Sequence, residues 1–253
     1  MKINFFSTTL NNSINAKLKV LFKKQFISSG KVSDDFENKF SKLFKLKNCI
    51  AVNSGTSALH LALKSGKIGV GDEVIIPAQT FIATGLAVLY TGAKPIFADI
   101  QRDTGNICPK SLSNKISKKT KAIIVVHWGG YPCDMQEISS IAKKHKIIII
   151  EDAAHGLGAK YRGIEIGNIS DFTCFSFQAK KQLTTGDGGM LVCKRHKDYK
   201  IAQKLKWFDI NRKSKSSFQG ERLYEISEIG YKYHLNDIAS TIGVENLKII
   251  KKN

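Results

Sequence analysis

Short runs of apolar residues alternate with longer segments of helical periodicity between residues 49 and 207. The apolar runs predict strands at 49–52, 73–76, 95–98, 122–126, 146–150, 172–177 and 190–193. The segments between them predict helices at 57–67, 81–90, 109–116, 135–145 and 197–207. Several strands are continuous in Ile and Val without polar alternation, so we expect them to be buried on both faces. The pattern predicts an α/β fold with a mostly parallel sheet flanked by helices.

The ends of the chain have a different pattern. Residues 10–44 predict two amphipathic helices, with Ser33 as a candidate cap of the second. Residues 211–225 are polar and predict an irregular loop, and 236–250 predict a last helix. We therefore divide the chain into an N-terminal helical segment (1–48), an α/β domain (49–210) and a loop with a final helix (211–253).

Composition narrows the class of protein. With 253 residues and 42% apolar content, the chain can bury a sizeable core. It has no apolar run long enough to span a bilayer, and its N-terminus lacks the features of a signal peptide. The five cysteines are widely spaced without a C-x-x-C pair, which is typical of reduced core residues. We therefore expect a cytoplasmic protein without a membrane partner.

The net charge is +19, from 40 Lys and Arg against 21 Asp and Glu, and it raises the hypothesis of a nucleic-acid partner. The excess is spread along the chain, and the sequence has no RNP-like aromatic pattern, zinc-finger spacing or helix-turn-helix signature. Because charge alone is a weak signal, nucleic-acid binding is not favoured as the main function.

Ligands of an open parallel sheet bind outside the carboxyl ends of its strands, so the polar residues there form the candidate site. Residues 53–57 (NSGTS) lie between a predicted strand and a predicted helix. The positive end of that helix makes a phosphate cradle, and Gly55 lets an anion approach the backbone. The alternative is an ordinary N-cap with a glycine turn.

Two further strand ends carry aromatic residues. Phe81 follows the strand at 73–76, where its ring could lie flat on a planar heterocycle, although such a residue is more often part of the core. The loop 127–132 (HWGGYP) could line the site or merely turn the chain.

Residues 151–156 (EDAAHG) follow four consecutive isoleucines. The adjacent carboxylates of Glu151 and Asp152 are costly at a buried strand end unless they meet a cation or strong donors. Only one of them faces the site, because successive strand positions point to opposite sides. That carboxylate suits the protonated ring nitrogen of an electron-sink cofactor, and His155 could stack on the ring. A metal site is less favoured, since no second cluster of ligands has a suitable spacing.

The segment 171–190 (DFTCFSFQAKKQLTTGDGGM) predicts a buried strand, a sharp reversal at TTGDGG and a second strand. Lys180 and Lys181 lie between strand and turn, where an amine can be desolvated and lose its proton, as a Schiff-base lysine requires. In a lysine-rich chain, such a pair is more often a solvated surface pair. Together with the cradle, the aromatic ring and the carboxylate, however, the loop lysine describes a site for pyridoxal phosphate.

Six segments resemble, in order and spacing, the DegT/StrS group of pyridoxal-phosphate-dependent aminotransferases that act on nucleotide-activated sugars. They are NSGTSALHLAL, GDEVIIPAQTFIAT, VVHWGGYPCDM, EDAAHGLGAKYRG, FSFQAKKQLTTGDGG and GYKYHLNDIASTIG. The resemblance runs from about residue 26 to the end of the chain. It implies an aspartate-aminotransferase-like large domain (PLP fold type I), with 49–210 as the cofactor-binding part, and a homodimer with active sites at the subunit interface. Family members usually carry a C-terminal small domain, which we expect to be largely absent here, so that 211–253 is the start of a truncated region.

The resemblance also assigns the site. Lys181 is implied as the Schiff-base and catalytic lysine, because the family's lysine follows the serine of the FSF motif by five positions. The other implied cofactor contacts are Ser176 with the Gly55 and Thr56 backbone at the phosphate, Asp152 at the pyridine nitrogen, Phe81 on the ring and His155 beside it. The family often has Asn-x-Arg where this chain reads Lys232-Tyr233-His234, so no role is carried over to Lys232 or His234.

The implied function is that of an enzyme, a pyridoxal-phosphate-dependent aminotransferase. It would move an amino group from glutamate to a keto group of a nucleotide-activated sugar, for surface polysaccharide or glycoconjugate biosynthesis. Pyridoxamine phosphate would be the cofactor form between the two half-reactions. The alternative is a truncated, catalytically silent cofactor-binding fragment or a partner subunit of a full-length sugar aminotransferase.

Overall fold

The computed structural model describes residues 7–211, 217–218 and 221–250. Its centre is a seven-stranded sheet with the order β1-β9-β8-β5-β4-β2-β3. The strands are β1 Cys49–Val52, β2 Glu73–Pro77, β3 Lys94–Ala98, β4 Thr120–Val126, β5 Ile148–Asp152, β8 Phe172–Ser176 and β9 Gly189–Cys193. Neighbouring strands run parallel except that β9 is antiparallel to β1 and to β8. The predicted mostly parallel sheet and the reversal between β8 and β9 are confirmed.

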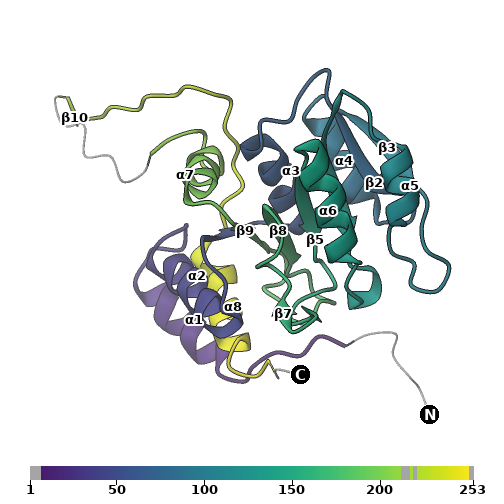
Figure 1. Ribbon diagram of the computed structural model, residues 1–253. Helices are drawn as coiled ribbons and strands as arrows, with labels where there is room; N and C mark the ends of the chain where they lie inside the picture. The colour runs from purple at the N-terminus through teal and green to yellow at the C-terminus, as the bar shows by residue number, and fades with distance from the viewer. Residues whose placement is uncertain (1–6, 212–216, 219–220, 251–253) are drawn as a thin grey trace, which may run out of the picture.

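Helices cover both faces of this sheet (Figure 1). One face carries α3 Gly55–Ser65, α4 Ile82–Tyr90 and α7 His196–Leu205. The other carries α5 Pro109–Asn114 and α6 Met135–His145 over β2, β4 and β5, and α2 Lys31–Phe44 with α8 Asp237–Asn246 over β1, β8 and β9. Within the described part of the chain, no helix has the length and apolar character needed to cross a membrane.

Strand residues alternate between the two helical layers. Ile50 and Val52 of β1 pack in the apolar cluster beneath α3, whereas Cys49 and Ala51 pack in the cluster beneath α2. Because both faces of each strand are buried, its residues do not alternate between polar and apolar. This explains the continuous apolar runs in the sequence. The helical layers therefore fix the strands firmly, and their carboxyl ends present a rigid edge.

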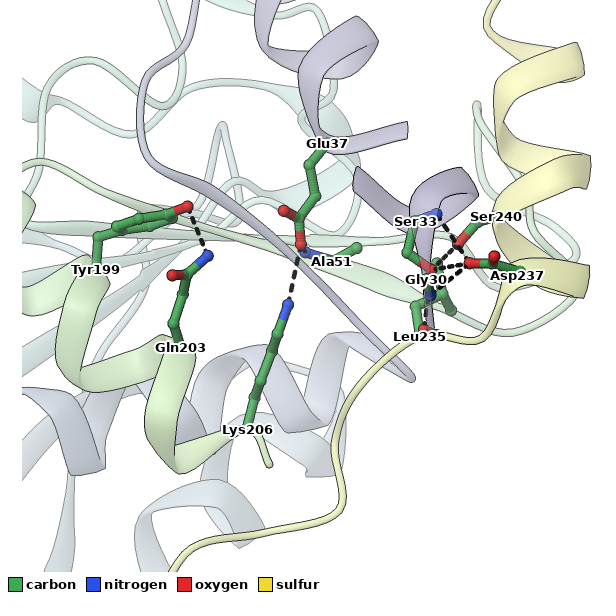
Figure 2. A network of polar contacts seen from close by, with 10 residues as sticks. All are labelled: Gly30, Ser33, Glu37, Ala51, Tyr199, Gln203, Lys206, Leu235, Asp237 and Ser240. Atoms are coloured by element: carbon green, nitrogen blue, oxygen red, sulfur yellow. Dashed lines mark hydrogen bonds and ion pairs between the residues drawn. The ribbon is translucent and has the colours of Figure 1, made fainter. Parts of the chain in front are cut away.

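The first and last helices of the described chain lie side by side, as the purple and yellow ribbons show (Figure 1). Helix α8 contacts both α1 Ile14–Lys23 and α2. The buried carboxylate of Asp237 accepts hydrogen bonds from the N–H groups of Gly30 (2.9 Å) and Ser33 (3.0 Å) and from the Ser33 hydroxyl (2.7 Å; Figure 2). The N-cap of α2 is Gly30, without a side-chain cap of its own. The prediction that Ser33 caps α2 is therefore wrong: Ser33 lies inside the helix, and the capping carboxylate comes from α8.

A second polar contact joins α2 to the sheet. Glu37 Oε1 accepts from the Ala51 N–H (2.8 Å) and from Lys206 Nζ (3.0 Å), at the end of α7 (Figure 2). Glu37 and Lys206 are both largely shielded from water, with side-chain exposures of 12% and 16%. Helices α2 and α8 are thus bonded to each other through Asp237, and α2 is bonded to the α/β domain through Glu37.

Two short hairpins are absent from the sequence prediction. They are β6 Lys160–Tyr161 with β7 Ile164–Glu165, and β10 Ser217–Phe218 with β11 Glu221–Arg222. A two-residue strand is too short to show alternation. The second hairpin falls in the predicted loop 211–225, of which 212–216 and 219–220 lie outside the described residues.

Candidate active site

The residues assigned to the cofactor from the sequence line one cavity of about 540 Å3 at the carboxyl end of the parallel strands. Its walls include Gly55, Thr56, Phe81, Asp152, His155, Ser176 and Lys181. A cavity of roughly 300 to 1,000 Å3 is typical of small-molecule sites. The structure therefore brings the separate motifs together at the edge where an open parallel sheet binds its ligand.

The start of α3 forms one end of this cavity. Ser54 is the N-cap, and its hydroxyl accepts from the Ser57 N–H (3.0 Å). The N–H groups of Gly55 and Thr56 belong to the first turn, which has no acceptor within the helix. A Cβ atom on Gly55 would lie 3.0 Å from Ser176 Cβ, so glycine permits the close approach of α3 and β8. The N-cap interpretation is confirmed, because Ser54 caps the helix. The phosphate cradle stays a prediction, to which the first-turn N–H groups and the nearby Ser176 hydroxyl are suited.

The carboxylate of Glu151 points away from the cavity. It is fully buried and lies 2.9 Å from His127 Nε2 and 2.8 Å from Thr173 Oγ1. The Cys133 N–H donates to His127 Nδ1 (3.1 Å), so the ring proton lies on Nε2 and is donated to Glu151. Glu151 is therefore satisfied within the core, and Asp152 is the carboxylate that the end of β5 presents to the cavity.

Asp152 faces the cavity from the end of β5. Its Oδ2 accepts from Thr84 Oγ1 (2.8 Å) and its Oδ1 from the Ala154 N–H (3.2 Å). Thr84 is itself fully buried and lies 2.7 Å from Thr80 Oγ1. These contacts orient the carboxylate and leave it able to accept a further donor, such as a protonated ring nitrogen.

The two loop lysines differ in environment. Both line the cavity, but Lys180 is exposed whereas Lys181 is half-buried. Burial lowers the pKa of the Lys181 amine, the charge of Lys180 lowers it further, and the carboxylate of Asp152 opposes both effects. A lowered pKa increases the share of neutral amine, which is the nucleophilic form. The environment favours Lys181 as the reactive amine.

Aromatic side chains flank the cavity. Phe81 precedes α4 and is 73% exposed. Burial and the charge of Lys181 lower the pKa of His155, which favours its neutral ring. The Trp128 ring lies edge-on to His155, with 6.1 Å between the ring centroids. A planar heterocycle carrying a phosphate and an electrophilic carbon would thus meet flat rings, an anion cradle, a carboxylate and an amine.

Several cavity residues were not assigned from the sequence. Trp128 shows that the loop after β4 lines the site, which is one of the two alternatives that the sequence left open. Gln178 and Asp187 also line the cavity, and their closeness to Lys181 in the chain was a usable signal. Thr84 gave no signal, because its contact with Asp152 exists only once α4 packs beside β5.

Lys232 does not line the cavity in the described chain. Its Nζ lies over the rings of Trp207 (5.6 Å) and Phe208 (5.8 Å), in a cation–π arrangement. The His234 ring packs against Trp207, with 3.9 Å between the ring centroids. Within this chain, both residues contact the segment after α7.

The sequence profile of the DegT/DnrJ/EryC1/StrS aminotransferase family matches residues 8–253. The chain is 40% identical over 228 residues to the spore coat polysaccharide biosynthesis protein SpsC of Bacillus subtilis, covering 88% of this chain and 58% of that protein. It is 39% identical over 221 residues to GDP-perosamine synthase of Escherichia coli O157:H7, covering 87% and 58%. The chain therefore spans somewhat less than three fifths of the length of these relatives.

Solved structures show the same fold. Sugar aminotransferase CalS13 from Micromonospora echinospora superimposes with a TM-score of 0.92 at 29% identity, covering 98% of this chain and 69% of that one. The PLP form of Spr1654 from Streptococcus pneumoniae gives a TM-score of 0.91 at 30% identity, covering 99% and 67%.

Proposed function

Since this chain belongs to the DegT/DnrJ/EryC1/StrS aminotransferase family, we propose that it binds pyridoxal 5'-phosphate in the strand-end cavity and aminates a nucleotide-activated keto sugar. The observation that carries the proposal is the half-buried amine of Lys181, with its lowered pKa, in one cavity with the buried carboxylate of Asp152. The amino donor is proposed to be glutamate. The names of the relatives GDP-perosamine synthase and SpsC support a nucleotide-linked sugar and a role in surface polysaccharide synthesis.

We assign the residues that line the cavity to different parts of the cofactor. When bound, pyridoxal phosphate carries the amino group between substrates and withdraws electrons from the carbon that loses a proton. The N–H groups of Gly55 and Thr56 and the Ser176 hydroxyl bind the phosphate. Asp152, held by Thr84, keeps the ring nitrogen protonated.

Two aromatic side chains and one lysine complete the assignment. Phe81 and His155 would flank the ring of the cofactor. Lys181 Nζ would hold the resting cofactor covalently, and as a free amine it would take a proton from one carbon and return it to the carbon on the other side of the amino nitrogen. The lowered pKa of Lys181 keeps Nζ available as a base nearer to neutral pH than an exposed lysine would be.

We also propose a homodimer with shared active sites. Helix α4 and strand β3, which follow Phe81 in the chain, carry the exposed apolar side chains of Ile82 (66%), Leu89 (54%), Tyr90 (56%) and Phe97 (56%). Exposed apolar side chains on these elements favour a protein partner. The five free cysteines suit the proposed cytoplasmic location.

The test is label transfer from nitrogen-15 glutamate. The protein is incubated with pyridoxal phosphate, labelled glutamate and a GDP-linked keto sugar, and the sugar is analysed by mass spectrometry. The proposal predicts a labelled amino sugar with native protein and none with Lys181→Ala. Unlabelled sugar in the presence of the native protein and bound cofactor would reject the proposed activity for this chain.

A second candidate is a cofactor-binding chain that does not turn over alone and acts as a partner subunit of a full-length sugar aminotransferase. It is favoured by the exposure of Phe81, which leaves one side of the cavity open to solvent. It predicts cofactor binding without label transfer, and label transfer on mixing with a full-length family member whose own lysine has been replaced.

A further inference from the structure

The loop that follows β4 forms a cavity wall, and its own backbone closes it with two hydrogen bonds, from the Gly130 N–H to the His127 carbonyl and from the Tyr131 N–H to the Trp128 carbonyl (both 3.0 Å). Trp128 lines the cavity and is 36% exposed. The next two residues are Gly129 (φ 60°) and Gly130 (φ 89°), both in the left-handed region. No atom lies within 4 Å of the position that a Cβ would take at Gly129. These bonds fix the shape of the turn, whereas its position at the cavity depends on contacts with other segments.

Asn106 supplies such an anchor. Its side-chain Oδ1 accepts from the Trp128 N–H (2.9 Å), and its Nδ2 donates to the Tyr131 carbonyl (3.0 Å). One carboxamide thus holds both ends of the turn from Trp128 to Tyr131. Asn106 is 1% exposed and does not line the cavity, so it acts on the wall from behind.

The segment that carries Asn106 is itself well fixed. The Gln101 N–H donates to the Asn106 carbonyl (2.8 Å), and an antiparallel bridge joins Ile100 to Ile107. Gly105 (φ 70°) passes so close to Trp128 that a Cβ there would lie 2.8 Å from the ring carbon Cδ1. Trp128 is therefore enclosed by this segment on one side, while its ring meets His155 at the cavity.

We propose that Asn106 is a positioning residue, which holds Trp128 and through it His155 on the cavity wall in the arrangement that binds the cofactor. Without the carboxamide, the Trp128 N–H and the Tyr131 carbonyl lose their partners, so the turn keeps its internal hydrogen bonds but loses two contacts that hold it in position. The link to the cofactor rests on the proposed function. The environment of Trp128, however, can be measured in cofactor-free protein. The role of Asn106 can therefore be rejected independently of the proposed function.

The experiment uses Trp128 as its own reporter. The chain has two tryptophans, and Trp207→Phe leaves Trp128 alone. In this background, we expect Asn106→Leu to red-shift the emission of cofactor-free protein and to increase its quenching by acrylamide. In a titration with pyridoxal phosphate, followed by quenching of the same emission, the apparent Kd is expected to rise about tenfold, the effect of losing about 1.4 kcal/mol of net hydrogen bonding.

Asn246→Leu is the matched control. Asn246 is 3% exposed, donates to the Thr184 carbonyl (3.0 Å) and accepts from the Asn11 N–H (2.9 Å). Its replacement therefore removes the same two kinds of hydrogen bond at a different place in the fold. It should leave the emission and quenching of Trp128 unchanged. If Asn106→Leu does not fold, Asn106→Asp keeps the acceptor, loses the donor and should give a smaller change of the same sign.

The inference is overturned if the folded Asn106 variant has the emission and acrylamide quenching of its parent, or if Asn246→Leu changes them equally. If the native protein binds no pyridoxal phosphate, the proposed function fails, and the fluorescence of the cofactor-free variants still decides the role of Asn106.

Discussion

The N-termini of helices α2 and α3 present the same backbone donors but differ in what occupies them. At α2, the Asp237 carboxylate accepts from the N–H groups of Gly30 and Ser33 and is 2% exposed (Figure 2). At α3, Gly55 and Thr56 line the cavity, and no side-chain carboxylate of the described chain is hydrogen-bonded to their N–H groups.

A helix N-terminus favours a negative charge through its free donors and its dipole. At α2, the chain itself supplies this charge, the Asp237 carboxylate of α8, and α8 is fixed to α2 as a result. At α3, we propose that a ligand supplies the negative charge. On this account, two similar local features serve stability in one place and binding in the other, and only the partner from a distant segment distinguishes them.

The largest effect is expected at the cavity carboxylate, which contrasts with the satisfied carboxylate of Asp237. Asp152→Asn keeps an oxygen for the Thr84 hydroxyl and removes the charge that would hold the ring nitrogen protonated. We expect amino transfer to slow by on the order of 100- to 1,000-fold, as for other losses of preorganised charge. Stopped-flow or steady-state rates measure it. Rates within threefold of the native protein would remove Asp152 from the mechanism.

Placing a carboxylate at the α3 terminus should make it resemble α2. Ser176→Asp puts a negative charge beside Gly55, where the phosphate is proposed to bind. We expect a loss of about 100-fold or more in affinity for pyridoxal phosphate, because like charges repel in a partly desolvated site. Ser176→Ala is the control and should lose only about five- to tenfold, the effect of one hydrogen bond. Equal effects of the two substitutions in a binding titration would argue against a phosphate at this position.

The converse change removes the carboxylate from the N-terminus of α2. Asp237→Ala leaves the N–H groups of Gly30 and Ser33 unpaired in the core. We expect a loss of about 2 to 3 kcal/mol in the free energy of unfolding, measured with urea. Asp35→Ala, which breaks an exposed pair with Lys39, is the control and should cost less than about 0.5 kcal/mol. Under conditions where Asp237→Ala is folded, its affinity for pyridoxal phosphate should match the native value, and a weakened affinity would contradict the separation of the two termini.

The smallest effect concerns the pH dependence of cofactor capture. The positive charge of Lys180 contributes to the lowered pKa of Lys181, so Lys180→Met should raise that pKa and reduce the neutral amine at a given pH. The rate of capture should therefore rise at higher pH in the variant than in the native protein. At neutral pH, we expect a decrease of less than about tenfold, because water screens the charge of exposed Lys180. An identical or lower midpoint in the pH profile would contradict the assigned cause.

The strands and most helices could be predicted from the sequence because their signals are local. The run Ile147 to Ile150, for example, needs no partner to read as a buried strand, and strand alternation already separated Glu151 from Asp152. The predicted bounds of this strand, 146–150, were wrong by two residues. β5 begins at Ile148, because Lys146 terminates α6 in a left-handed conformation, and it ends at Asp152.

Features that depend on distant contacts could not be predicted. Ser33 resembles an N-cap, but the capping oxygen comes from Asp237, 204 positions away from Ser33. Asn106 resembles an ordinary turn residue until the fold brings the loop after β3 to the loop after β4, where its carboxamide reaches Trp128. The seven residues assigned to the cofactor could be named because each belongs to a motif, whereas the residues that hold them have no motif. The roles of these seven residues and the division into three domains stay predictions.

The most direct measurement is the absorbance spectrum of the purified protein with added pyridoxal phosphate, before and after glutamate, for the native chain, Lys181→Ala and Lys180→Met. The account predicts a visible band of covalently held cofactor in the native protein and in Lys180→Met, which glutamate then removes, and no such band in Lys181→Ala. A band of native intensity in Lys181→Ala, or its loss in Lys180→Met alone, would contradict the assignment of the reactive amine and with it the central claim.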